Sequence, residues 1–204
     1  MYNKSTSFFE SQRKLISRFF AGLFLVFAVL VVPVDASASL YEWMELLGFI
    51  LLIVAAMGRV WCSIYISGRK NRELCTAGPY SLCRNPLYLF SFVGVVGFFI
   101  ALQGIILCVV AAALFLLYYR GVILSEEQRL AHLFGNPFER YVQTTPRFFP
   151  SFSGLTTLDE LKVAPRIIER GLREVVWFLL AIACIEVVEM LHEQGHLIYF
   201  KLPF

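Results

Sequence analysis

Long apolar runs alternate with short polar stretches along the chain. At about 1.5 Å per residue, a run of 16 residues extends about 24 Å, which covers most of the hydrocarbon core of a bilayer. The pattern predicts an all-α integral membrane protein with about five transmembrane helices. These are expected within Phe19–Val32, Trp43–Ile66, Leu87–Leu102, Ile105–Tyr119 and Val175–Leu191.

The third and fourth runs are separated only by Gln103-Gly104, so the chain must cross the membrane, turn and come back. This helical hairpin brings the polar stretch 71–88 to the same face of the membrane as the polar stretch 125–135. We therefore expect an arginine, several aromatic residues and a pair of glutamates to gather at that face.

The composition agrees with a membrane protein. Hydrophobic residues make up 58% of the 204 residues and charged residues 16%, which is too apolar for an ordinary soluble domain. A net charge of +3 is too small to indicate a nucleic-acid partner, and the lipid bilayer is the expected partner. The cysteines show no paired metal spacing, and we expect buried thiols rather than disulfides. They are Cys62, Cys75, Cys83, Cys108 and Cys184.

Basic residues indicate the orientation. The loop 33–45 contains acidic residues and no basic ones, so it is expected outside, with the N-terminus and the polar end of the hairpin on the cytoplasmic side. The cytoplasmic basic residues are Lys4, Arg13, Lys14, Arg18, Arg69, Lys70, Arg72 and Arg84. A cleavable signal peptide ending near Ala36-Ser37-Ala38 is the alternative to a retained first helix.

Several charged residues fall inside or beside the predicted spans. Arg59 either snorkels to the inner interface or points into a polar pocket. Glu186 and Glu189 are expected to face other helices rather than lipid. A short amphipathic helix is predicted over Glu126–Phe134, capped by Ser125, and another is predicted to start at Pro165. Its stripe of Arg166, Arg170 and Arg173 either binds anionic lipid or is simply solvated.

Three regions follow from this pattern: residues 1–66 with two N-terminal spans, residues 67–150 with the hairpin, and residues 151–204 with a linker and the last helix. In the middle region, Gly78-Pro79-Tyr80 reads as a turn, and Arg84-Asn85-Pro86 opens the third helix with proline in its first turn. The helix start and Arg84 favour a carboxylate or phosphate. Glu126 and Glu127 suit an ammonium or ribose hydroxyls, and Tyr80 and Tyr88 offer faces for a flat ring or a cation.

Four short pieces in this order give the chain a resemblance to a known family. They are Gly78 to Tyr80, Arg84 to Tyr88 (R-[HN]-P-x-Y), Glu126-Glu127 and Phe134 to Tyr141, followed by Thr145-Pro146-Arg147. Over about Arg59 to Pro150 the chain resembles the isoprenylcysteine carboxyl methyltransferase family and, more distantly, the phospholipid methyltransferases.

The resemblance implies a membrane methyltransferase that binds S-adenosylmethionine in a pocket at the cytosolic face, with Arg84 and Glu126 as candidate catalytic residues. Arg120 is the nearest counterpart of a family arginine that holds the substrate carboxylate. Asn85 stands where the family often has histidine, which keeps hydrogen bonding but removes a titratable group. The cofactor-binding residues expected from the resemblance are Arg72, Glu73, Leu74, Cys75, Tyr80, Asn85, Pro86, Leu87, Tyr88, Glu126 and Glu127.

The implied reaction is carboxyl O-methylation of a lipophilic, isoprenylcysteine-like acceptor. A carboxylate is already a nucleophile, so the protein has only to align it with the methyl group and exclude water. The alternatives are a phospholipid amine or a small lipophilic amine or thiol, and an amine would have to be deprotonated first.

Other functions stay open. The segment His192-Glu193-Gln194-Gly195-His196 matches the H-E-x-x-H zinc motif, with Glu189 as the nearest third ligand, or it is a polar helix end. A non-catalytic membrane scaffold and a related reductase using a nicotinamide cofactor are further alternatives. We expect no metal at the main site, and the sequence does not indicate an oligomeric state.

Overall fold

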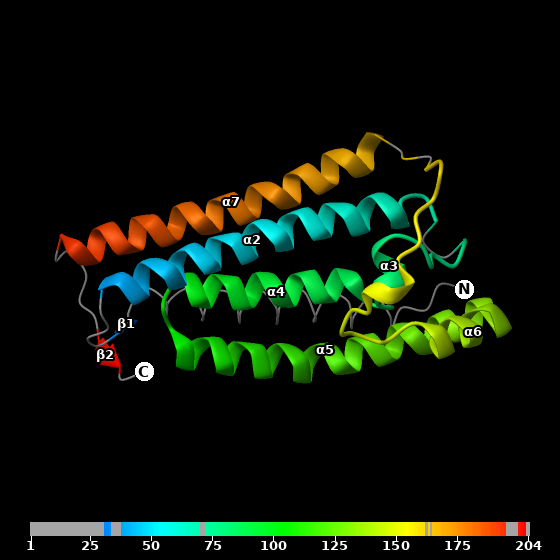
Figure 1. Ribbon diagram of the computed structural model, residues 1–204, viewed down its shortest axis with the longest axis horizontal. Helices are drawn as coiled ribbons and strands as arrows, with labels where there is room; N and C mark the ends of the chain where they lie inside the picture. The colour runs from blue at the N-terminus through cyan, green and yellow to red at the C-terminus, as the bar shows by residue number, and fades with distance from the viewer. Residues whose placement is uncertain are drawn as a thin grey trace, which may run out of the picture.

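The computed structural model describes residues 31–33, 38–69, 72–161, 163, 165–194 and 200–202, and these are mostly helical, as predicted. Its four long helices run side by side (Figure 1). They are α2 (Ala38–Ile66), α4 (Pro86–Ala101), α5 (Ile105–Phe134) and α7 (Pro165–Glu193). The short helices α3 (Pro79–Leu82) and α6 (Asn136–Thr144) and the single turn η1 (Phe152–Gly154) lie at one end. At the other end, β1 (Val31–Pro33) pairs in parallel with β2 (Phe200–Leu202), a contact the sequence did not indicate.

The predicted hairpin is present as α4 and α5. Gln103 adopts a positive φ of 60°, and the amides of Gln103 and Gly104 donate to the carbonyls of Ile100 (2.9 Å) and Phe99 (3.1 Å), which closes the turn. Helix α4 begins at Pro86, where proline loses no helical hydrogen bond. The two arms therefore return the chain to the end where α3 and α6 lie.

Helices α2 and α4 pack closely because glycines face each other across their contact. A Cβ atom on Gly48 would lie 2.4 Å from the backbone nitrogen of Ala101, and one on Gly97 would lie 2.9 Å from the carbonyl oxygen of Gly48. Near the same level, α7 adds Ile185 to a core cluster with Leu52 and Ala101. Small residues at such contacts allow helix backbones in a membrane to approach.

The Gly48→Ala variant is expected to lose about 1–3 kcal/mol of stability, because the new methyl group collides with backbone that no rotamer change can move. Gly121→Ala on α5 is the matched control. A Cβ atom there meets nothing within 4 Å, and alanine is the better helix former by about 0.5–1 kcal/mol. Thermal unfolding in one detergent compares the two variants, and equal midpoints would contradict the close α2–α4 contact.

Two of the described helices are long and apolar enough to cross a membrane, namely α2 from Leu40 to Ile66 and α5 from Ile105 to Phe134. Helix α4 is a shorter apolar helix. The outer face of α5 exposes large apolar side chains, such as Leu117 at 71%. The predicted first span, Phe19–Val32, lies outside the described residues except for its last two, and the total of five spans stays a prediction.

Three predicted boundaries were wrong. The stretch Glu126–Phe134 is the last part of α5 rather than a separate helix, because no proline occurs between Ile105 and Phe134 and the backbone stays helical through Gly121 up to Gly135. Ser125 is therefore inside a helix and caps nothing. Helix α7 starts at Pro165, as predicted, but continues without a break into the last apolar run, and α2 already starts at Ala38.

The described side chains of Arg59 and Glu186 compare differently with the predictions. Arg59 points at polar groups of other helices, in agreement with the polar-pocket alternative, because its guanidinium binds the Glu174 carboxylate at 2.8 and 3.1 Å and also donates to the Ser91 hydroxyl. Glu186 does not face other helices. The neighbouring Ile185 is the residue that points into the core, and Glu186 lies about 100° further round the helix, where it is exposed.

Candidate functional site

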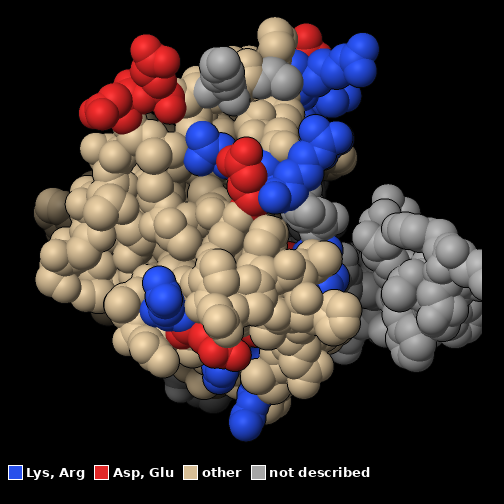
Figure 2. Space-filling view, turned by 90° about the vertical axis from the view of Figure 1, so that its right-hand side faces the viewer, with Lys and Arg blue, Asp and Glu red and all other residues tan. Residues whose placement is uncertain are grey.

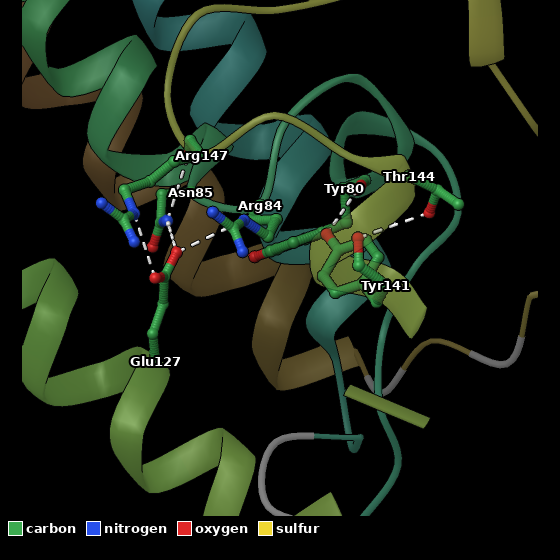
Figure 3. Close-up of polar contacts among 7 residues, drawn as sticks. All are labelled: Tyr80, Arg84, Asn85, Glu127, Tyr141, Thr144 and Arg147. Atoms are coloured by element: carbon green, nitrogen blue, oxygen red, sulfur yellow. Dashed lines mark hydrogen bonds and ion pairs between the residues drawn. The ribbon is translucent and has the colours of Figure 1, made fainter. Parts of the chain in front are cut away.

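The start of α4 and the second half of α5 meet at the end of the hairpin, as the sequence predicted. The Tyr88 hydroxyl of α4 donates to the Glu126 carboxylate of α5 over 2.8 Å. One turn earlier, Arg84 Nε lies 3.4 Å from Glu127 Oε1. The two polar stretches therefore form one cluster, which Figure 3 draws around Glu127.

Glu127 is the centre of this cluster, and its side chain is only 11% exposed. Oε1 accepts from Asn85 Nδ2 at 3.3 Å and lies close to Arg84, while Oε2 accepts from Arg147 Nε at 3.0 Å (Figure 3). Two guanidinium groups around one carboxylate leave a net charge of +1 (two positive, one negative). Glu127 is thus occupied in holding the two arginines in place.

Arg84 has unused hydrogen-bonding capacity. Its side chain is 8% exposed, and its Nε and Nη1 atoms are buried without a hydrogen-bond partner among the described residues. A guanidinium stays charged in proteins, and buried donors without acceptors are costly. Arg84 is therefore suited to an anionic group, and carboxylate and phosphate match its planar fork of donors.

Glu126 is in a different environment from its neighbour. It accepts from Tyr88 and pairs weakly with Arg129 at 3.4 Å, and its side chain is 31% exposed. A carboxylate offers about four acceptor positions. Glu126 can therefore accept further hydrogen bonds from hydroxyl or ammonium groups.

A segment that follows α6 covers the cluster, and we call residues 145–158 the strap. The amide of Arg84 donates to the Pro146 carbonyl over 2.8 Å, and Asn85 Nδ2 donates to the Arg147 carbonyl over 3.1 Å. Helix α6 fixes the start of the strap, because the buried Tyr141 donates its hydroxyl to the Tyr80 carbonyl over 2.5 Å. The strap thereby places Arg147 beside Glu127.

A row of aromatic rings borders the cluster on the side of the apolar hairpin helices. Tyr88 contacts Tyr119 of α5 at a ring-centroid distance of 5.1 Å, and Tyr119 stacks on Phe115 at 4.1 Å. Phe92 joins Phe115 at 5.5 Å. Ring faces attract cations and stack on flat groups, so this row suits a cationic or planar ligand.

Sequence reasoning gave no role to Arg147 or Tyr119. Arg147 was visible only as the last residue of Thr145-Pro146-Arg147, and its contact with Glu127 depends on how α6 and the strap fold. Tyr119 precedes the buried Ile123 and Glu127 by one and two helical turns, so the three residues lie on the same side of α5. This spacing of four residues was the sequence signal that could have identified Tyr119.

The remaining predicted site residues lie around or away from the cluster. Cys75 donates its thiol to the Tyr65 carbonyl at 3.5 Å and packs with Cys62 and the buried Tyr80. Arg120 is exposed on α5 and makes none of the cluster's contacts described above. Their roles toward a ligand stay predictions, as do those of Arg72 and Glu73 (exposed), Leu74 and Leu87 (half-buried) and Pro86 (buried).

Burial also controls the ionisation of groups beneath the strap. It raises the pKa of the Cys83 thiol to about 11, and it raises the pKa of Cys75 and the phenol pKa values of Tyr80 and Tyr141. All four groups are therefore neutral at physiological pH. Since the thiolate is the nucleophilic form of cysteine, Cys75 and Cys83 are unsuited to nucleophilic catalysis.

Folded protein treated with N-ethylmaleimide near pH 7.5 is expected to stay unlabelled at Cys83, because this thiol is fully buried and has the raised pKa. Peptide mass spectrometry measures the labelled fraction of Cys83. Denatured protein, in which Cys83 should react, is the control. Labelling of Cys83 as fast in folded as in denatured protein would contradict its burial.

The zinc-motif alternative falls largely outside the described residues. Gly195 and His196 are not described, nor are the side chains of Glu189, His192 and Glu193. Within the described part of the chain, no group of three or more His, Cys, Asp or Glu side chains is arranged to hold a metal ion.

The apolar hairpin, with Arg84, Tyr88, Glu126 and Glu127 at its end, lies in the part of the chain that matches a family of methyltransferases. Residues 43–137 match the phospholipid methyltransferase family, which includes the isoprenylcysteine carboxyl methyltransferases. The chain belongs to this family, and the resemblance seen in the sequence is confirmed.

Two relatives extend the similarity beyond the matched residues. The nickel-cobalt-cadmium resistance protein NccN of Alcaligenes xylosoxydans xylosoxydans is 39% identical over 155 residues, covering 76% of this chain and 72% of that protein. The cobalt-zinc-cadmium resistance protein CzcN of Cupriavidus metallidurans is 38% identical over 149 residues, covering 73% of this chain and 68% of that protein. No solved structure matches the chain.

Proposed function

We propose that this protein transfers a methyl group from S-adenosylmethionine to a lipophilic acceptor at the end of the α4–α5 hairpin. The observation that carries the proposal is that Arg84, which has buried unused donors, lies at the same end of the hairpin as the hydrogen-bonded pair of Tyr88 on α4 and Glu126 on α5. Family membership supports it, since these methyltransferases generally use this cofactor.

The residues present fit the chemical groups of S-adenosylmethionine. Arg84 suits its carboxylate, Glu126 suits its ammonium or ribose hydroxyls, and the rings of Tyr88 and Tyr119 suit the sulfonium or the adenine. When bound, the cofactor supplies an electrophilic methyl group on a positively charged sulfur. The protein's part is to orient both reactants and to exclude water.

We propose a carboxylate as the acceptor, as in an isoprenylcysteine-like group. A carboxylate needs no general base, and the half-exposed Arg147 is the guanidinium of the cluster that stays open to it once Arg84 holds the cofactor carboxylate. Glu127 is already paired with both arginines and is not free to act as a base. An amine or thiol acceptor is the alternative, with Glu126 then the nearest carboxylate to take a proton.

The deciding experiment incubates the purified protein with radiolabelled S-adenosylmethionine and a membrane extract. Label released by mild base is expected, because a carboxyl methyl ester is base-labile. Label that resists base would indicate nitrogen or sulfur methylation instead. If folded protein neither transfers label nor binds the cofactor, the scaffold alternative is favoured, and NADPH binding would favour the reductase.

Cofactor titration tests the individual residues. Glu126→Ala is expected to weaken S-adenosylmethionine binding about 10- to 100-fold, because a hydrogen bond to a charged group contributes about 1.5–3 kcal/mol. Tyr88→Phe keeps the ring but removes the hydroxyl that orients Glu126, so a smaller loss of about fivefold is expected. Glu139→Ala on the exposed face of α6 is the control. Wild-type affinity of Glu126→Ala would remove Glu126 from the cofactor site.

The relatives' names suggest a physiological setting, which we propose extends to this protein: methylation of a membrane component that improves growth in nickel, cobalt, zinc or cadmium salts. A metal-sensitive bacterial host expressing the wild type is expected to outgrow one expressing equal amounts of Glu127→Ala in at least one of these salts. Equal growth in all four would contradict this setting without affecting the proposed chemistry.

A further inference from the structure

The strap exposes large apolar side chains although it has almost no regular secondary structure. Phe149 and Phe152 are each 74% exposed, Leu155 is 50% exposed and Leu158 is 38% exposed. Isolated exposed apolar residues are common on soluble surfaces, but four within ten residues form a patch that marks an interaction site.

Hydrogen bonds hold the strap in this arrangement. Besides the bonds to Arg84 and Asn85, the amide of Ser151 donates to the Leu82 carbonyl over 2.9 Å. The amide of Gly78 donates to the Thr156 carbonyl over 2.7 Å, and the Thr156 amide donates to the Ser81 hydroxyl over 3.1 Å. The exposed side chains therefore cannot turn inward without breaking backbone contacts along the strap.

The strap also reaches back along the apolar hairpin. The ring of Phe148 meets that of Phe92 at 5.9 Å, and Phe92 lies six residues, or about 9 Å, into α4 from Pro86. Phe149 follows directly and points outward, at an edge-to-face angle of 90° to Phe148. The strap thus adjoins the apolar hairpin helices, of which α5 is long enough to span a bilayer.

The charges at this end fit a membrane surface. In Figure 2, which faces this end, charged side chains form separate groups on a largely uncharged surface. Arg140, Arg147, Arg166 and Arg170 are exposed on the strap and on the adjoining helices α6 and α7. Acidic side chains are also exposed in or next to the same segments, namely Glu139, Asp159, Glu160 and Glu169. Apolar side chains bordered by charges of both signs suit the headgroup region, where long arginine side chains keep their charged ends in water.

We propose that the strap is a membrane-interface segment, with Phe149, Phe152 and Leu155 inserted among the acyl chains of the same leaflet in which the end of the hairpin lies. Its backbone covers Arg84 and Asn85, so the insertion holds the cluster at the bilayer surface. An acceptor with a lipid tail would then meet the cluster without leaving the membrane. This placement of the strap does not depend on which group is methylated.

Single tryptophans test the placement in the full chain in lipid nanodiscs. The native Trp43, Trp61 and Trp177 are replaced by phenylalanine, and Phe149→Trp and Phe152→Trp are made in that background. Leu117→Trp, on the exposed face of α5, is the lipid reference, and Gln143→Trp, on the exposed polar face of α6, is the water reference. Size-exclusion profiles select folded variants.

Fluorescence quenching by lipids brominated near the headgroup is compared with quenching by aqueous acrylamide. For both strap variants we expect lipid quenching close to that of Leu117→Trp and several times that of Gln143→Trp. Quenching by acrylamide alone would place the strap in water and overturn the proposal. Protection from both quenchers would mean that protein covers the strap, and it would also overturn the proposal.

Discussion

Replacing Glu127 with alanine is expected to lower the rate of methyl transfer at least about a hundredfold, which corresponds to about 2.7 kcal/mol in the activation barrier. The Glu127 carboxylate is the common partner of Asn85, Arg84 and Arg147. Without this carboxylate, the guanidinium groups of Arg84 and Arg147 repel each other, and the buried Arg84 loses its ion-pair partner. A displacement of about 1 Å in a positioning group can cost about 100-fold in rate.

Two variants separate this effect from general disruption of α5. Glu127→Gln keeps an oxygen acceptor for Asn85 but loses the charge, so an intermediate rate is expected. Gln128→Ala alters an exposed side chain at the next position and should leave the rate unchanged. Label transfer and cofactor affinity are measured for each. If Glu127→Ala kept wild-type activity, Arg84 would not need this carboxylate in order to be placed.

The part of the site that the sequence predicted follows from chain connectivity. The short Gln103-Gly104 turn forces helices α4 and α5 to lie side by side, and Pro86 is the first residue of α4. Polar residues just outside the two arms must then meet. Arg84 and Glu127 are therefore neighbours because of hairpin geometry, although 43 positions separate them in the sequence.

The sequence did not decide which way a side chain points around its helix, or which residue far along the chain it contacts. Glu126 and Glu127 are the same residue type, but about 100° of helix rotation separates their side chains. Glu126 therefore contacts Tyr88, and Glu127 contacts Arg84. The polar composition after Tyr119 suggested a helix boundary. Backbone hydrogen bonds continue regardless of side-chain polarity, so α5 runs unbroken to Phe134.

Arg59 is the clearest case of a distant partner, because its carboxylate comes from Glu174, 115 positions later. Removing that carboxylate in Glu174→Gln is expected to cost about 2–3 kcal/mol. Loss of one partner of a fully buried pair costs about 3–5 kcal/mol, and here the side chains are 22% and 31% exposed. For a chain of this size the loss corresponds to about 5–10 °C in the unfolding midpoint.

Arg59→Met should be the milder single change, because a carboxylate left alone can be neutralised by a proton whereas a guanidinium cannot. The double variant Arg59→Met, Glu174→Gln leaves no unpaired charge and is expected to recover most of the loss, since neutral replacements of such pairs are often tolerated. Thermal unfolding in nanodiscs measures all three variants. Losses that simply add in the double variant would mean that the two residues do not hold α7 against α2 and α4 through this pair.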